Sequence, residues 1–154
     1  MSVSILDGTL ESVTATKRGK IVRLKDVTFR KADGSGESLP GLTVTTPKVA
    51  EALKPGLEGR FYLFKALDHK GIHAVRPKGG ATVMAFPRTN ETLMAILFVI
   101  NVVWVAATVA LRDGVPLLGV GLMVFTAVLF FLYRATRIEA EAQVAADNPG
   151  APVQ

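Results

Sequence analysis

Two uncharged apolar runs, residues 93–111 and 115–133, lie close together near the C-terminal end of the chain. The hydrocarbon core of a bilayer is roughly 30 Å thick, and a helix rising about 1.5 Å per residue crosses it with about 20 residues. Each run is therefore just long enough to span a membrane. Only Arg112, Asp113 and Gly114 separate the runs. So short a connection predicts a helical hairpin whose two outer ends lie on the same side of the membrane.

Basic residues near the outer ends of the hairpin predict its orientation. Lys and Arg close to membrane segments favour the cytoplasmic side. We therefore take Arg88 before the first run, and Arg134 and Arg137 after the second, as topology determinants. The first residues of the chain show neither a basic leader nor the apolar segment of a signal peptide. We expect a multi-pass protein with both termini in the cytoplasm.

The part before the hairpin predicts one small β domain over residues 1–80. Strand-like runs cover about residues 8–16, 21–31, 39–45, 60–67 and 72–76 and are separated by turn residues. Thr46 and Pro47 predict a helix of about two turns after the third run, because Thr caps helices and Pro fits their first turn. The order β-β-β-α-β-β is typical of an OB-like barrel. An SH3-like barrel is the alternative.

The second predicted strand has an irregular alternation of apolar residues. Val22 and Leu24 share one face, whereas Val27 and Phe29 fall on the other. One extra residue near Lys25-Asp26 would bring both pairs to the core. We therefore predict a β-bulge there, which would also bend the strand as closure of a barrel requires.

Three further segments complete the predicted organisation. Residues 81–91 are expected to form a linker or an extra strand, and residues 92–134 the membrane hairpin. Residues 135–154 contain Pro149, Gly150 and Pro152 and show little apolar periodicity. We expect a flexible cytoplasmic tail there, after a helical continuation to about residue 146.

Polar and small residues predict helix contacts within the hairpin. Asn101 lies in the middle of the first run, where an unpartnered amide is costly in hydrocarbon. We interpret it as a structural residue that bonds across the hairpin or to another copy, with a polar gate or a subunit contact as alternatives. Small residues let membrane helices approach closely, and the predicted contact residues are Asn101, Ala106, Ala110, Gly119 and Gly121. Neither run contains an ionisable residue, which argues against an ion-coupled transporter.

A basic surface is predicted on the first two strands and their turn, at Lys17, Arg18, Lys20, Arg23 and Lys25. Each basic residue near an anionic leaflet gains about 1 kcal/mol. An OB barrel can instead bind single-stranded nucleic acid when exposed aromatic residues accompany the basic ones. Phe29, Phe61, Tyr62 and Phe64 are needed for the core, however. We therefore favour the anionic inner leaflet, or a solvated face, over nucleic acid.

The sequence carries no pattern typical of an enzyme or a metal site. The absence of cysteine excludes disulfides, thiolate catalysis and cysteine-ligated metals. His69 and His73 flank a predicted turn, where side chains are commonly exposed, and we assign neither of them a metal or catalytic role. The Gly-rich residues 33–37 lie between strands, and so lack the helix that a phosphate-binding loop precedes. No cofactor is expected.

The predicted architecture resembles that of small bacterial membrane proteins that join a short membrane hairpin to an OB-like barrel and act as partners of larger membrane assemblies. This resemblance concerns the architecture and covers no diagnostic motif. It implies a non-enzymatic module of a bacterial inner membrane, whose cytoplasmic barrel recruits or regulates a protein partner. The alternatives are a membrane-tethered binder of nucleic acid or nucleotide, and an auxiliary subunit of a transporter or channel. A homo-oligomer is possible with each of these functions.

Overall fold

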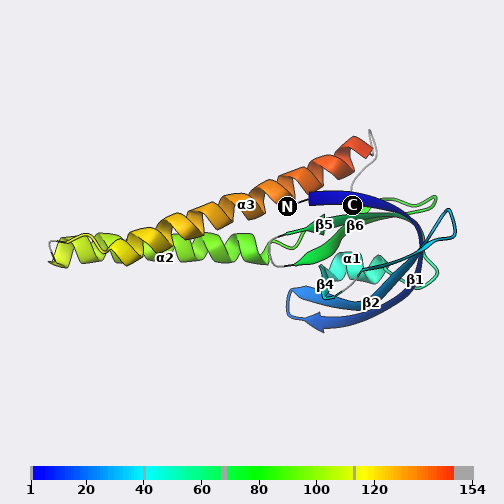
Figure 1. Ribbon diagram of the computed structural model, residues 1–154, viewed down its shortest axis with the longest axis horizontal. Coiled ribbons are helices and arrows are strands. Elements are labelled where there is room, and N and C mark those ends of the chain that lie inside the picture. Colours follow the sequence, from blue (N-terminus) through cyan, green and yellow to red (C-terminus); the bar gives the residue numbers. More distant parts are fainter. Residues whose placement is uncertain (1, 40, 67–68, 113, 148–154) are drawn as a thin grey trace. The chain divides into compact units, whose positions relative to one another are not determined.

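The computed structural model describes residues 2–39, 41–66, 69–112 and 114–147 (Figure 1). The chain divides into two compact units. One unit comprises Met1–Pro87 together with Thr136–Gln154 and contains all the described strands. The other unit comprises Arg88–Ala135 and is helical. Because helix α3 (Leu117–Asp147) begins in the second unit and ends in the first, it belongs to both.

The first unit is built on a closed five-stranded β-barrel. Its strands are β1 (Ser2–Arg18), β2 (Ile21–Lys31), β4 (Thr43–Thr45), β5 (Glu58–Lys65) and β6 (Lys70–Pro77). Around the barrel they follow the order β1-β2-β4-β6-β5, and β5 pairs with β1 to close the ring. Strands β4 and β6 are parallel, and the other neighbours are antiparallel. The predicted mainly β barrel followed by two apolar helices is thus confirmed.

The predicted bulge in β2 is present. Ser12 of β1 pairs with Thr28, but Thr14 pairs with Lys25, so β2 carries one more residue than β1 over this interval. Asp26 has a φ of +53°, and its carbonyl oxygen accepts a hydrogen bond of 2.6 Å from Ser12 Oγ. The extra residue lets both apolar pairs of β2 reach the core, where four side chains are buried: Val22, Leu24, Val27 and Phe29.

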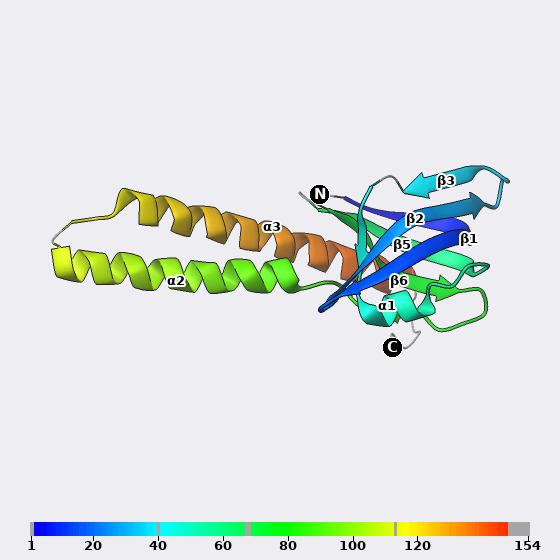
Figure 2. The ribbon, with the colours of Figure 1, turned by 90° about the horizontal axis from the view of Figure 1, so that it is seen from below.

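Helix α1 (Pro47–Ala52) forms where Thr46 and Pro47 predict it. Val49 N–H donates to Thr46 Oγ1 at 3.5 Å, and the proline occupies the first turn. The helix lies beside β6 (Figure 2). Val49 is fully buried and joins the barrel core. The Phe29 and Phe61 rings pack there with their centroids 4.8 Å apart.

Two details of the sheet differ from the prediction. The third predicted strand, residues 39–45, is divided into β3 (Gly36–Leu39) and β4, and Gly41 has a φ of +82° between them. Strand β1 is longer than predicted, because its first half pairs with β5 and its second half with β2. A short strand β7 (Val83–Met84) pairs with β6 in the segment that we expected to be a linker or an extra strand.

Two helices, α2 (Thr89–Arg112) and α3, are long and apolar enough to cross a membrane. Their most apolar windows have mean hydropathies of 2.5 and 2.0. Only 0% of the first window and 11% of the second is buried, whereas a helix in the core of a soluble protein is mostly buried. Of the predicted turn between the helices, Asp113 lies outside the described residues.

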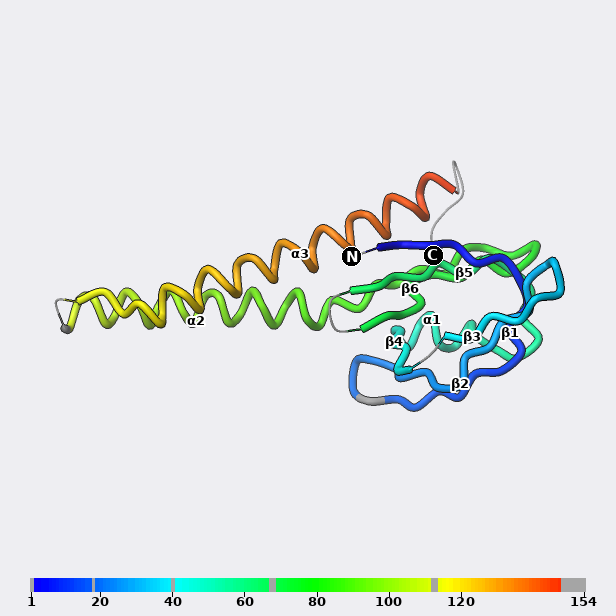
Figure 3. Tube along the Cα trace, viewed as in Figure 1, coloured from blue at the N-terminus to red at the C-terminus, as the bar shows by residue number. Residues whose placement is uncertain are grey.

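The end of α3 corrects the prediction of a flexible tail over residues 135–154. Figure 3 traces α3 as one unbroken helix, which continues to Asp147, and its last residues belong to the barrel unit. Ala140 and Val144 are fully buried. Because these two small residues lie one helical turn apart, their apolar stripe is too narrow to stand out in the sequence. Residues 148–154 lie outside the described residues.

Candidate functional site

A cluster of polar side chains lies where the end of α3 meets strands β5 and β6. Arg60 Nη1 and the Tyr62 hydroxyl both donate to the carboxylate of Asp147. Arg76 Nη2 lies 3.0 Å from Asp147 Oδ2, and its Nη1 donates to the Asp147 carbonyl oxygen at 3.1 Å. Three side chains from two strands thus converge on the last described residue of the helix. We call Arg60, Tyr62, Arg76 and Asp147 the Asp147 clamp.

The Asp147 clamp extends to strand β1 through Arg60. Arg60 Nε donates to Asp7 Oδ1 at 2.6 Å, and Nη2 donates to Oδ2 at 2.8 Å. This forked geometry is the strong form of an arginine–carboxylate pair. The Tyr62 hydroxyl, followed by the two arginines, lowers the pKa of Asp147. The carboxylate is therefore ionised at neutral pH, and the helix end is held by charge-assisted hydrogen bonds.

Apolar contacts lie beside the Asp147 clamp under the same helix end. Val144 packs against Tyr62 and Ala74, with Met84 of β7 at the edge. The orange-to-red end of α3 runs along this part of the barrel (Figures 1 and 2). Helix α3 is therefore fastened to the barrel by buried side chains and by ion pairs together.

His73 corrects the expectation of an exposed turn residue. Strand β6 already begins at Lys70, so His73 lies inside the strand, where it is fully buried. Tyr62 pairs with Ala74, whereas the next residue, Leu63, pairs with Ile72. His73 is thus the extra residue of a β-bulge, a feature that re-aims side chains. Nothing in the alternation of the sequence indicates this bulge.

The surroundings of His73 are apolar. Its ring centroid lies 5.8 Å from that of Phe86 and 6.0 Å from that of Phe64. Neither ring nitrogen has a hydrogen-bond partner of good geometry among the described residues. Burial lowers the pKa of His73 to about 4, and the nearby backbone of Ala140 in α3 offsets only part of that shift. The imidazole is therefore neutral at pH 7 and acts as a packing group beneath the helix.

The predicted basic surface lies on the hairpin formed by β1 and β2. Lys17, Lys20 and Lys25 are exposed and Arg23 is half-buried. We call these four residues the basic hairpin. The side chain of Arg18 lies outside the described part of the chain. Among the described residues, no member of the basic hairpin has an ion-pair partner.

Five basic residues elsewhere on the barrel have acidic partners. Arg30 pairs with Glu11 on the neighbouring strand. Lys31 lies 2.6 Å from Glu37, and Lys78 lies 2.6 Å from Glu58. Arg60 and Arg76 belong to the Asp147 clamp. The basic hairpin therefore differs from these five residues in having positive charge without local compensation.

The aromatic residues of the barrel lie inside it. Phe29, Phe61 and Tyr62 have exposed fractions of 0%, and Phe64 is 2% exposed. Stacking of nucleic acid bases needs exposed rings. The four aromatic residues considered for such a surface are therefore occupied by packing.

Gly119 is the predicted contact residue that lies between the two helices. A Cβ atom there would come within 2.8 Å of both Trp104 Cζ3 and Val105 Cγ2. Gly121 lies two residues further on, about 200° around the helix, and a Cβ there meets no atom within 4 Å. Two other predicted contact residues are exposed to the surroundings of the hairpin: Ala106 and Ala110. The close approach of α2 and α3 thus depends on Gly119.

Asn101 does not form the predicted hydrogen bond across the hairpin. Its side chain is half-buried in α2 and makes no hydrogen bond to a residue within the described ranges. The nearby threonines bond within their own helices: Thr108 Oγ1 donates to Trp104 O at 2.8 Å, and Thr126 Oγ1 to Leu122 O at 2.9 Å. An amide in hydrocarbon needs a partner, so Asn101 stays a candidate contact to another chain.

The three predicted topology determinants lie near the ends of the helices. Arg88 is exposed immediately before α2. The Arg134 guanidinium lies 6.0 Å from the ring centroid of Phe130. Arg137 is bonded to Glu141 one turn later, at 3.1 Å. Arg134 and Arg137 thus flank the point where α3 passes from the helical unit into the barrel unit.

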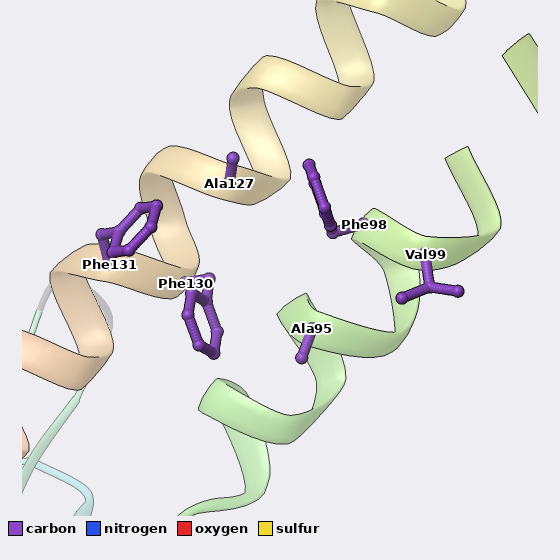
Figure 4. Close-up of a pocket in the computed structure, with 6 residues that line it drawn as sticks. All are labelled: Ala95, Phe98, Val99, Ala127, Phe130 and Phe131. Atoms are coloured by element: carbon purple, nitrogen blue, oxygen red, sulfur yellow. The ribbon is translucent and has the colours of Figure 1, made fainter. Parts of the chain in front are cut away.

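The helical unit has an apolar groove of about 230 Å³ (Figure 4). Helix α2 contributes Ala95, Phe98 and Val99, and helix α3 contributes the other lining residues: Ala127, Phe130 and Phe131. With no polar side chain in its lining, the groove can hold an acyl chain or apolar side chains but offers no group for catalysis.

The polar groups of the Asp147 clamp and of His73 are engaged or enclosed within the described chain. The described ranges contain no cluster of three or more His, Asp or Glu residues that could hold a metal ion. The Asp147 carboxylate is occupied by three donors, and His73 is sealed from solvent. No family model, curated protein or solved structure matches the chain. The functional assignment therefore depends on geometry alone.

Proposed function

We propose that this chain is a non-enzymatic module of a bacterial inner membrane, whose barrel recruits or regulates a protein partner at the cytoplasmic face. The continuity of α3 carries the proposal. One helix holds an apolar part of membrane-spanning length and a terminal part buried on the barrel. Since Ala140, Val144 and Asp147 fasten that terminal part, the barrel is tied to a spanning helix by more than a flexible linker.

The strand order supports an OB-type barrel. Strands β1, β2 and β4 follow one another as antiparallel neighbours, and α1 lies between β4 and β5 in the chain. The parallel pair β4–β6 and the closing pair β1–β5 complete the ring. A simple up-and-down meander would contain no parallel pair. Five strands closed in a Greek-key order, with one helix before the fourth, are what an OB fold requires.

The low burial of both helices supports a location in the membrane. The apolar segments of both helices are almost entirely exposed, and in water they would form a very large hydrophobic surface. Arg88 and Arg134 lie at the outer ends of the hairpin, where the positive-inside rule favours the cytoplasm. The barrel is continuous with these ends, so it shares their side of the membrane.

A partner of protein character suits the surface of the barrel beside β3. A hollow of about 370 Å³ is lined by polar groups and by two leucines, Leu39 and Leu42, of which Leu42 is 41% exposed. Strand β3 pairs with β2 alone among the described strands. The free edge of such a strand can add an extended peptide through main-chain hydrogen bonds. The hollow and the free strand edge suit the binding of a protein segment, and neither is a feature that catalysis requires.

Membrane topology is tested first with single cysteines. The chain has no cysteine of its own, so Ser35→Cys in the barrel and Gly114→Cys between the helices give labelling without background. In intact cells, an impermeant thiol reagent is expected to label Gly114→Cys, and to label Ser35→Cys only after permeabilisation. Labelling of intact cells at Ser35→Cys but not at Gly114→Cys would show that the orientation is opposite to the proposed one. Release of the protein by alkaline carbonate would overturn the membrane assignment.

The contact with a partner is tested with a photo-crosslinking amino acid. Placed at Leu42, it is expected to link the chain to one defined protein in cells. Placed at Val99 in the apolar groove, it reports contacts of the helices. The auxiliary-subunit function would be favoured instead by two results together: crosslinks from Val99 that disappear in the Asn101→Leu variant, and no crosslinks from Leu42. Links from neither position to any protein would contradict the proposal.

A further inference from the structure

We infer that the basic hairpin binds anionic lipid headgroups of the leaflet next to which the barrel lies. This inference rests on the proposed membrane anchoring and specifies a second, weaker contact with the same membrane. Lys17, Lys20, Arg23 and Lys25 supply the charge, and the bilayer surface is the partner.

Three members of the basic hairpin, Lys17, Lys20 and Arg23, have no acidic residue next to them in the sequence, whereas Lys25 is followed by Asp26. The sequence has no acidic residue between Glu11 and Asp26. Cross-strand pairing places Arg23 opposite Thr16 and Lys25 opposite Thr14, so their cross-strand neighbours are neutral. Because none of the four residues forms an ion pair within the described chain, their positive potential is open to a partner outside it.

The position of the hairpin within the barrel unit supports a membrane as that partner. Val22, just after the turn, pairs with Thr45 of β4. The next residue, Thr46, donates through Oγ1 to the carbonyl oxygen of Ala85 at 3.4 Å. Ala85 precedes by three residues Arg88, where the barrel unit ends and the chain continues into α2. The turn between β1 and β2 therefore lies at the end of the barrel from which the chain leaves for the membrane.

Figures 1 and 2 show the two turns that flank β2 within the barrel unit. The blue turn between β1 and β2 lies at one end of β2, and the turn between β2 and β3 lies at the other end. Strand β2 spans Ile21–Lys31, and an extended strand rises about 3.3 Å per residue. The two turns are thus separated by the length of a whole strand, so Ser35, in the turn between β2 and β3, provides a control position.

The type and arrangement of the charges favour lipid headgroups over nucleic acid. Three of the four residues are lysines, which act as flexible point charges and attract anionic headgroups without a fixed geometry. They are distributed over β1, the following turn and β2, an arrangement that suits an extended anionic surface. The aromatic residues that would stack on bases are buried. A charged bilayer is therefore the partner that fits best.

The test uses the full chain in lipid nanodiscs, with a fluorescent label on Thr16→Cys or, as the control, on Ser35→Cys. Headgroup-spin-labelled lipid quenches a label that lies at the membrane surface. In discs with about 30% phosphatidylglycerol, we expect quenching at Thr16→Cys to be at least about twofold stronger than in neutral phosphatidylcholine discs, with no such difference at Ser35→Cys. About 0.5 M salt should remove the difference, because it shortens the Debye length to a few ångströms.

Two double variants separate local charge from total charge. Lys17→Glu/Lys20→Glu should abolish the dependence on anionic lipid, whereas Lys54→Glu/Lys78→Glu, with the same change in net charge, should retain it. Equal quenching of Thr16→Cys in neutral and anionic discs would overturn the inference. Loss of the dependence on anionic lipid in both double variants would overturn it too. Binding of a labelled single-stranded oligonucleotide that competes with the quenching would also overturn it, in favour of nucleic acid. Failure of the chain to enter discs at all would contradict membrane anchoring itself.

Discussion

Two groups of basic residues on the same barrel are used in different ways. Arg60 and Arg76 are partly buried under α3 and share the carboxylates of Asp147 and Asp7. Lys17 and Lys20 lie on the hairpin of β1 and β2, and have no ion-pair partner among the described residues. The first group is satisfied within the chain, whereas the second is available to something outside it.

The difference shows how one small domain separates stability from recognition. Arginine suits the first group because its planar fork binds two carboxylates at once. Lysine suits the second because its charge is mobile and remains hydrated. Breaking an internal pair should therefore change the stability of the barrel unit, and reversing an exposed charge should change only binding. The following predictions test this separation in order of expected size.

The largest effect is expected from Val144→Asp. Val144 is fully buried against Tyr62 and Ala74, so an unpaired carboxylate there should lower the free energy of unfolding of the barrel unit by about 3–5 kcal/mol. Ala145→Asp introduces the same group at an exposed position next to it and should have little effect. Chemical denaturation in detergent measures both. Equal effects of the two variants would contradict the burial of the helix end.

Acidification is expected to have the next largest effect, through His73. Burial holds the pKa of His73 at about 4 instead of 6.5. Between these values the unfolded chain takes up a proton that the folded chain does not. His73 therefore lowers the stability as the pH is lowered from 6.5 to 4, and its contribution is constant below that range. The loss should reach about 3 kcal/mol.

A matched variant separates His73 from Asp147 in this experiment. His73→Leu should remove the dependence of stability on pH between 6.5 and 4. Asp147 has a lowered pKa, so its contribution is present above the usual aspartate range and is lost only at more acidic pH. Unfolding midpoints measured across the two windows therefore distinguish the two groups. A pH dependence unchanged in His73→Leu would show that another group causes it.

A smaller effect is expected from Asp147→Asn. The amide retains the shape of the side chain but removes the charge that two arginines and Tyr62 contact. Since the two arginines and Asp147 itself are partly exposed, the loss should be about 1–2 kcal/mol. Hydrogen exchange should localise it to the last turns of α3, while the core strands stay protected. Faster exchange across the whole barrel would indicate that the clamp stabilises more than the helix end.

The smallest effect on stability is expected from Lys17→Glu/Lys20→Glu. Both lysines are exposed and without ion pairs in the described chain, so the free energy of unfolding should change by less than about 0.5 kcal/mol. Thermal unfolding at low and high salt measures it. A loss comparable to that of Asp147→Asn would show that the basic hairpin is part of the internal charge network, and would remove the contrast between the two groups.

Local signals predicted a large part of the fold. Strand β2 has the predicted bounds and the predicted bulge, because the mismatch between Val22/Leu24 and Val27/Phe29 allows one solution if both pairs are to be buried. Helix α1 follows from Thr46 and Pro47. The two apolar helices follow from length and hydropathy. In each case the determinant lies within about one turn or one strand of the element that it specifies.

The features under α3 were not predictable in the same way. His73 is buried because of a bulge in β6, and the alternation of polar and apolar residues in the sequence gives no sign of that bulge. Asp147 is an ordinary polar residue until the chain brings Arg60, Tyr62 and Arg76 to it. Ala140 and Val144 are too small and too few to mark a buried face in the sequence. The contacts of Ala140, Val144 and Asp147 depend on partners at least sixty residues away, and the burial of His73 depends on the pairing of β6 with β5.

The sequence by itself determined the membrane-length helices, the order of strands and helix, the bulge in β2 and the uncompensated charge between Glu11 and Asp26. These follow from periodicity, composition and turn chemistry, which act over short stretches of chain. The tertiary structure decided that β1 and β5 close the barrel, that His73 is buried, and that the end of α3 is fastened through Asp147. The physical reason is that burial and ion pairing depend on which distant surfaces meet, and no local pattern records that.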